Sequence, residues 1–197
     1  MKRRATYHHR DLANALVAAA ERLVAKHGVA GFSLREAARA VGVDPAACYR
    51  HFRDKDAILE ELARRGFTRM AAEMARALAT RRTPIAKLVA IGHVYVEFAV
   101  AYPSSFRAMF GPTGFEARDP RRRGIHLRGP YEILEQTVRA WLGGRRVEAA
   151  SLLLWSGVHG VASLLVDGAI RIPARERTRR VGRLLRALVA AAGSPGG

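Results

Sequence analysis

Residues 32–55, FSLREAARAVGVDPAACYRHFRDK, decide the fold of this chain. Ser33 stands before a run of apolar residues at helical spacing, and Glu36 follows it by three positions. This is the spacing of a capping box, in which the two side chains satisfy free amides at the start of a helix. Gly42 lies where the run ends, and glycine readily turns the chain there. The stretch therefore begins with a short, capped helix that ends in a turn.

A second short helix starts directly after this turn. Asp44 is a good N-terminal cap, and Pro45 is tolerated in the first turn, where no amide donor is needed. Two helices over about residues 33–40 and 44–51, joined by a glycine turn, are typical of a helix-turn-helix, whose second helix enters the major groove of DNA. The same spacing suits an αα-hairpin in any helical protein, so the rest of the chain must decide between the two.

The composition of the 197-residue chain favours a polyanionic partner. Lys and Arg number 34 against 17 Asp and Glu, which gives a formal net charge of +17 and a pI of about 11.4. Much of the excess lies downstream of the helix-turn-helix, where solvated helix surfaces are expected to carry it. The lone cysteine, Cys48, excludes an intramolecular disulfide and suits a reducing compartment. We expect Cys48 to be a small buried side chain, with a redox role left open.

A cytoplasmic protein without a membrane partner is expected. The basic N-terminus leads into no long apolar run, so it does not resemble a secretion signal. Residues 151–166 come nearest to a membrane span, but they include Ser, Gly and His. Lys2, Arg3 and Arg4 are placed to reach the DNA backbone or minor groove, although a disordered tail is the simpler interpretation.

Apolar residues recur at helical spacing over almost the whole chain, and no segment alternates as a β-strand does. Further helices are expected over about residues 11–26, 54–80, 84–101, 104–110, 127–142 and 147–170, and from Pro173 onward. The loop 111–123 is the expected mobile segment. The fold class is therefore all-α, with a three-helix DNA-binding head over residues 1–52 and a larger helical domain over residues 53–197, of which residues 53–80 connect the two.

The head resembles the TetR family of bacterial transcriptional regulators. The resemblance rests on His27-Gly28 at the end of the first helix, Phe32-Ser33-Leu34-Arg35 opening the second, the turn Val41-Gly42-Val43, and Tyr49-Arg50-His51-Phe52 with Lys55 at the close. These features cover about residues 10–65, and the close is the distinctive part.

The candidates for DNA contact are Ser33, Arg35, Pro45, Ala46, Ala47, Tyr49, Arg50, His51 and Lys55. The resemblance implies that Tyr49, His51 and Lys55 bind phosphate oxygens. Residues 45–47 open the recognition helix and offer only methyl and shape contacts to the bases, unlike family members with polar residues there. The arginines of the set are then the donors for guanine or phosphate. A solvated surface position remains open for Arg50, and a half-buried aromatic role for Tyr49.

The larger domain resembles the Trp…His-Gly variant of TetR C-terminal domains, through Trp155, His159 and Gly160. This resemblance implies a domain that dimerises and binds a small effector. The helix 147–170 is apolar nearly all round, and the last helix carries one apolar stripe. We expect both to pair with their counterparts in a homodimer, whose two-fold symmetry suits a palindromic operator.

Candidates for the wall of an effector cavity are the aromatic, histidine and methionine side chains of this domain. They are His93, Tyr95, Phe98, Phe106, Met109, Phe110, Trp141, Trp155 and His159. Each is also a natural core residue. An apolar or aromatic effector is expected, because acidic side chains are few here, and an anionic effector stays open.

The sequence indicates no enzyme, cofactor or metal site, because hydrolase, phosphate-loop and zinc spacings are missing and the histidines are scattered. It predicts a ligand-responsive transcriptional regulator, a repressor that releases operator DNA when an effector binds. Two alternatives remain open. A non-specific basic DNA-binding protein would bind random DNA as well as promoter DNA, whereas a helical small-molecule carrier would bind no DNA.

Overall fold

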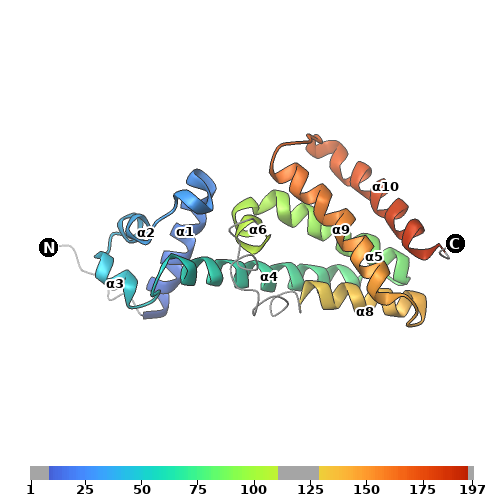
Figure 1. Ribbon diagram of the computed structural model, residues 1–197, viewed down its shortest axis with the longest axis horizontal. Coiled ribbons are helices and arrows are strands. Elements are labelled where there is room, and N and C mark those ends of the chain that lie inside the picture. Colours follow the sequence, from blue (N-terminus) through green and yellow to red (C-terminus); the bar gives the residue numbers. More distant parts are fainter. Residues whose placement is uncertain (1–8, 111–128, 195–197) are drawn as a thin grey trace. The chain divides into compact units, whose positions relative to one another are not determined.

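The computed structural model describes residues 9–110 and 129–194, and within them every element of regular structure is a helix (Figure 1). The helices are α1 (His9–Gly31), α2 (Leu34–Val41), α3 (Pro45–Tyr49), α4 (Lys55–Ala79), α5 (Pro84–Ala101), α6 (Pro103–Phe110), α8 (Pro130–Leu142), α9 (Val147–Val166) and α10 (Ala174–Gly193). The predicted all-α fold is confirmed. The loop 111–123 and the basic residues 2–4 lie outside the described part of the chain.

The chain divides into two compact units. The head unit comprises residues 1–66 and 104–122, and the body unit comprises residues 67–103 and 123–197. Helix α4 contributes its first half to the head unit and its second half to the body unit, and nearly all of α6 belongs to the head unit. The sequence predicts a head over residues 1–52. The head unit of the structure also includes the first half of α4 and nearly all of α6.

The helix-turn-helix in the head unit has the caps that its sequence predicts. The Ser33 side chain caps α2, and Asp44 caps α3 by accepting the Ala46 amide at 2.7 Å. Gly42 ends α2 in the left-handed conformation, and α1 breaks at Gly28, which also has a positive φ. Helix α1 packs against α2, and α2 packs against α3. Cys48 is fully buried, as expected, so α3 is attached to the core of the head near its C-terminal end.

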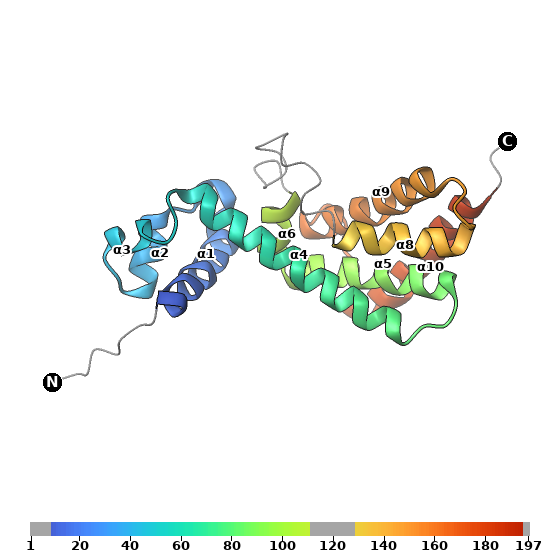
Figure 2. The same ribbon diagram turned by 90° about the horizontal axis from the view of Figure 1, so that it is seen from below.

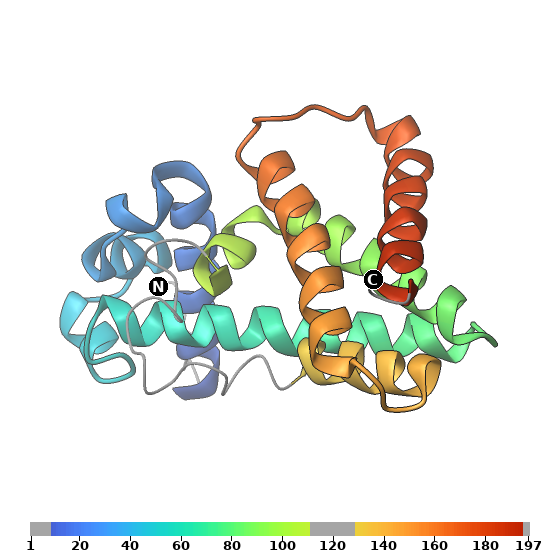
Figure 3. The same cartoon turned by 45° about the vertical axis from the view of Figure 1, so that its right-hand side comes forward.

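The body unit is a bundle with α5 at its centre. Helix α5 packs against α8, α9 and α10, and α9 also packs against α8 and α10 (Figures 2 and 3). Both α5 and α9 are long and apolar enough to cross a membrane by length and composition alone, although polar side chains interrupt both. A core helix of a bundle passes the same test, and α5 has helices on several sides here.

Helix α9 ends earlier than its apolar pattern predicts. The pattern continues to Ile170, but the helix stops at Val166. Gly168 has a φ of 71°, which turns the chain out of the helix, and Ile170 is exposed. Helix α10 then begins after Pro173, as predicted.

The left-handed Gly42 gives a test of the turn. Its φ of 78° and ψ of 32° are strained for residues with a Cβ, so Gly42→Ala should lower the free energy of unfolding by about 1 kcal/mol. Asn tolerates this conformation better, so Gly42→Asn should lose less. Chemical denaturation followed by circular dichroism measures both, and an Ala variant as stable as the native protein would contradict the turn geometry.

Candidate DNA interface and ligand site

The start of α2 is held by a reciprocal contact between Ser33 and Glu36. The Ser33 hydroxyl accepts a hydrogen bond from the Glu36 amide at 3.3 Å and donates one to the Glu36 carboxylate at 2.7 Å. The hydrogen bond from Ser33 lowers the pKa of Glu36, which keeps this carboxylate ionised. The Ser33 hydroxyl is thus engaged within the head, whereas Arg35, in the first turn of α2, is exposed.

Helix α3 presents small side chains first and large polar ones last. Ala46 is exposed in its first turn, between the half-buried Pro45 and Ala47. Tyr49 ends the helix with 49% of its surface exposed, and Arg50 after it is also exposed. A tyrosine so placed in a small helical head offers both a hydroxyl and an apolar ring to a partner.

Lys55 ties the start of α4 to the end of α1. Its ammonium donates to the Ala30 carbonyl oxygen at 2.8 Å and lies 5.9 Å from the centroid of the Phe32 ring. An ammonium carries several N–H donors and can bind more than one acceptor. His51, the remaining candidate for phosphate contact, is half-buried.

An aromatic cluster lies inside the body unit. The Tyr95 hydroxyl on α5 and Nδ1 of His159 on α9 share a hydrogen bond of 2.7 Å. The Trp155 ring lies 5.7 Å from that of His159, and Tyr131 of α8 meets Trp155 edge-on at 5.7 Å. Tyr95, Trp155, His159 and Tyr131 are called the aromatic cluster below. The sequence analysis named the first three but missed Tyr131, because a single tyrosine on an amphipathic helix carries no distinguishing signal.

A buried hydroxyl lies on the same helix as Trp155. Ser151 of α9 is fully buried one turn before Trp155, and its Oγ has no hydrogen-bond partner among the described residues. Leaving such a group unpaired costs about 1–3 kcal/mol. The hydroxyl is therefore a polar group that a bound molecule could satisfy.

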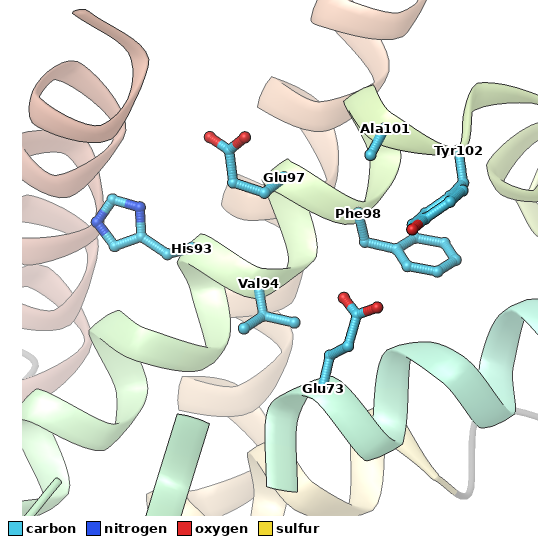
Figure 4. A pocket seen from close by; sticks show the side chains of 7 residues that line it. All are labelled: Glu73, His93, Val94, Glu97, Phe98, Ala101 and Tyr102. Atoms are coloured by element: carbon cyan, nitrogen blue, oxygen red, sulfur yellow. The ribbon is translucent and has the colours of Figure 1, made fainter. Parts of the chain in front are cut away.

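The other ligand candidates lie elsewhere. Phe106, Met109 and Phe110 belong to α6 in the head unit, where Met109 packs closely against Gly66 of α4. Trp141 lies against Gly193 of α10. A groove of about 350 Å³, called the α5 groove below, is lined by Glu73, His93, Val94, Glu97, Phe98, Ala101 and Tyr102 (Figure 4). The candidates thus lie in four separate places, and only the aromatic cluster combines several rings with a hydrogen-bonded polar pair.

His93 and His159, the two histidines of the body unit within the described residues, resist protonation. Burial lowers the pKa of His159, and burial lowers that of His93 by more than nearby Glu97 raises it. The unfolded chain therefore binds more protons than the folded chain as the pH falls through the ordinary histidine range. The free energy of unfolding is therefore at its full value above about pH 6.5, where these histidines are neutral in both states, and it falls progressively below that pH.

The pH dependence of thermal stability tests the lowered pKa values of these two histidines. The Tm should fall between pH 7.5 and 5.5, and the fall should be smaller in His159→Asn, because asparagine does not titrate. His27→Asn changes an exposed histidine and should keep the full dependence. Thermal unfolding by circular dichroism across this range is the measurement, and equal slopes in the native protein and His159→Asn would contradict the assignment.

Two family models match the chain. Residues 16–62 match the bacterial regulatory proteins of the tetR family, and residues 88–191 match the tetracyclin repressor-like C-terminal domain. A relative from Bacillus subtilis, the uncharacterized HTH-type transcriptional regulator YobS, is 34% identical over 93 residues, which are 47% of this chain and 48% of the relative. The chain thus aligns with about half the length of that curated relative.

Solved structures share the whole fold. A protein of unknown function from Rhodococcus sp. RHA1 superposes with a TM-score of 0.74 at 29% identity, over 95% of this chain and 96% of that one. The fatty acid degradation regulator FadR from Bacillus halodurans gives a TM-score of 0.73 at 16% identity, over 93% and 96% of the two chains. The C-terminal family model covers more than half of this chain and the N-terminal one covers its helix-turn-helix, so the chain belongs to the tetR family of bacterial regulatory proteins.

Proposed function

We propose that the chain is a cytoplasmic, ligand-responsive transcriptional regulator, a repressor that binds palindromic operator DNA as a homodimer and releases it when a small effector binds. The observation that carries this proposal is the exposed Tyr49 and Arg50 at the end of a capped recognition helix in a tetR-family head. The net charge of +17 adds a general attraction to DNA.

We assign the proposed roles on DNA to side chains that reach the surface of the head. Tyr49 and Lys55 would bind phosphate oxygens, while Arg35 and Arg50 would donate to phosphates or guanine. Ala46 supports a methyl contact with a base, because it is the exposed residue of the first turn of α3. Ser33 and Glu36 would act indirectly, by fixing α2 beneath the recognition helix.

The exposed face of α9 supports the homodimer. Leu152, Leu153 and Leu164 have 51%, 43% and 44% of their surface exposed, and Ala149 and Ser156 are exposed on the same helix. Contiguous apolar surface of this kind on a regulator marks an interaction site. We infer that α9 and α10 pair with their counterparts in a second copy, as the homodimer requires.

The aromatic cluster is the proposed effector site. Its rings favour an apolar or aromatic effector, and Tyr95, His159 and the unpaired hydroxyl of Ser151 supply polar contacts. Trp155 and His159 of the cluster are also two of the residues that carry the resemblance to the Trp…His-Gly variant of TetR C-terminal domains, and we propose that the body unit is of this type. Helix α4, which is shared by the two units, would carry the response, provided that the effector binds the two dimer geometries with different affinities.

DNA binding is tested on fragments that the protein selects from its own genome. Tyr49→Phe and Arg50→Ala should each weaken binding at fixed salt by roughly ten- to a hundredfold, the equivalent of one hydrogen bond to a charged group. Arg22→Ala removes an exposed arginine of α1 outside the motif and should change little. Fluorescence anisotropy measures these affinities. Equal affinity for selected and random DNA would instead support a non-specific DNA-binding protein, and no DNA affinity would support a carrier.

The dimer is tested by adding charge to α9. The double variant Leu152→Glu, Leu164→Glu should be monomeric, because burying two carboxylates between the copies costs more than the lost apolar contact gains. Ile85→Glu changes an exposed residue of α5, with 48% of its surface exposed, and should remain dimeric. Light scattering after size exclusion gives the mass, and a native protein that is monomeric at micromolar concentration would contradict the proposal.

A further inference from the structure

We propose that the α5 groove is a binding site for a small organic cation, separate from the aromatic cluster. The groove lies within the body unit, between the second half of α4 and the last turns of α5 (Figure 4). Its volume of about 350 Å³ suits a ligand of one ring or a short chain.

The charge of the groove is opposite to that of the chain. Glu73 and Glu97 are the only acidic residues in the sequence between Phe67 and Pro103, and both line this groove. They come from different helices, α4 and α5, so the fold brings them to one place. Both acidic side chains of this stretch therefore line one groove in a protein of net charge +17.

The two carboxylates differ in what already binds them. Glu97 receives two hydrogen bonds from the Arg177 guanidinium of α10, at 2.9 and 3.0 Å. Glu73 is half-buried, and no ion pair or hydrogen bond reaches its side chain from the described residues. Glu73 is therefore the carboxylate of the groove that has no bonded partner among the described residues, and Arg69, one turn earlier on α4, is the nearest basic residue before it on that helix.

Aromatic rings stand beside the Glu73 carboxylate. The Glu73 side chain points toward the rings of Phe98 and Tyr102 (Figure 4), whose centroids are 5.2 Å apart. The Arg69 guanidinium lies 4.4 Å from the centroid of the Tyr102 ring and covers one of its faces, so a ligand would have to use the part of this ring that Arg69 leaves uncovered. A carboxylate next to aromatic faces is the combination that recognises ammonium groups.

The end of α5 adds to the attraction. Ala101 and Tyr102 close the helix within the groove, and the last turn contains no basic residue. The carbonyl groups at a helix C-terminus carry partial negative charge, which stabilises nearby cations. Burial also lowers the pKa of His93 at the opposite end of the groove, so its imidazole adds no positive charge at neutral pH.

The ligand's ammonium would therefore lie between Glu73 and the rings of Phe98 and Tyr102, with its apolar part along Val94. Phe98 forms the buried floor, with 1% of its surface exposed. This site does not depend on the proposed regulation of DNA, because none of its residues belongs to the helix-turn-helix or to the aromatic cluster. Its test accordingly uses no DNA.

Isothermal titration of the full chain with benzylamine, which is protonated at pH 7, tests the site. Benzyl alcohol has nearly the same shape without charge, and it should bind at least about tenfold more weakly. Glu73→Gln should weaken benzylammonium binding about tenfold, and Tyr102→Leu about threefold through loss of a cation–π contact. Glu132→Gln removes an exposed carboxylate from α8 of the same unit and should leave the affinity unchanged.

Several results would overturn the proposal. These are the absence of benzylammonium binding at millimolar concentration, equal affinity for benzyl alcohol, and an affinity that Glu73→Gln leaves unchanged. An equal loss in Glu73→Gln and Glu132→Gln would show general charge attraction and would also overturn it. The far-ultraviolet circular dichroism of each variant confirms that it is folded, and Glu73→Gln preserves the size of a half-exposed side chain.

Discussion

The need to bury α5 on most of its sides governs the body unit. This helix is apolar almost throughout, and α8, α9 and α10 surround it. Covering α5 uses one face of α9 and leaves the leucines of its other face exposed. The same packing brings Tyr95 to His159 inside the bundle and leaves Glu97 at the margin, where Arg177 of α10 meets it. The exposed leucine face of α9, the aromatic cluster and the α5 groove are thus three consequences of one requirement.

The head unit follows a different principle, since local sequence determines most of it. Side-chain caps begin α2 and α3, and Gly42 sets the turn between them. Tertiary contacts then orient this motif, among them the packing of α1 against α2, the buried Cys48 and the bond from Lys55 to the Ala30 carbonyl. The exposed residues of α3 owe their position to these contacts, so changes in the core of the head would move them.

Sequence patterns predicted what depends on neighbouring residues. The helices, the caps at Ser33 and Asp44 and the all-α class follow from short-range spacing, and the structure has them. Contacts between distant segments could not be predicted in this way. Nothing in the sequence places Tyr131 beside Trp155, or assigns α6 to the head unit. Helix α9 ended early because the left-handed Gly168 overrode a continuing apolar pattern, and sequence spacing does not reveal a backbone conformation.

The hydrogen bond between Tyr95 and His159 has a consequence for selectivity. The Tyr95 side chain is buried and that of His159 is half-buried, so a molecule that separates them must offer a donor or acceptor in place of the bond that it breaks. At the proposed effector site, a pure hydrocarbon would enter only beside the intact pair, whereas a molecule with one well-placed polar atom would replace either partner. The pair would then distinguish apolar molecules of similar size by a single heteroatom.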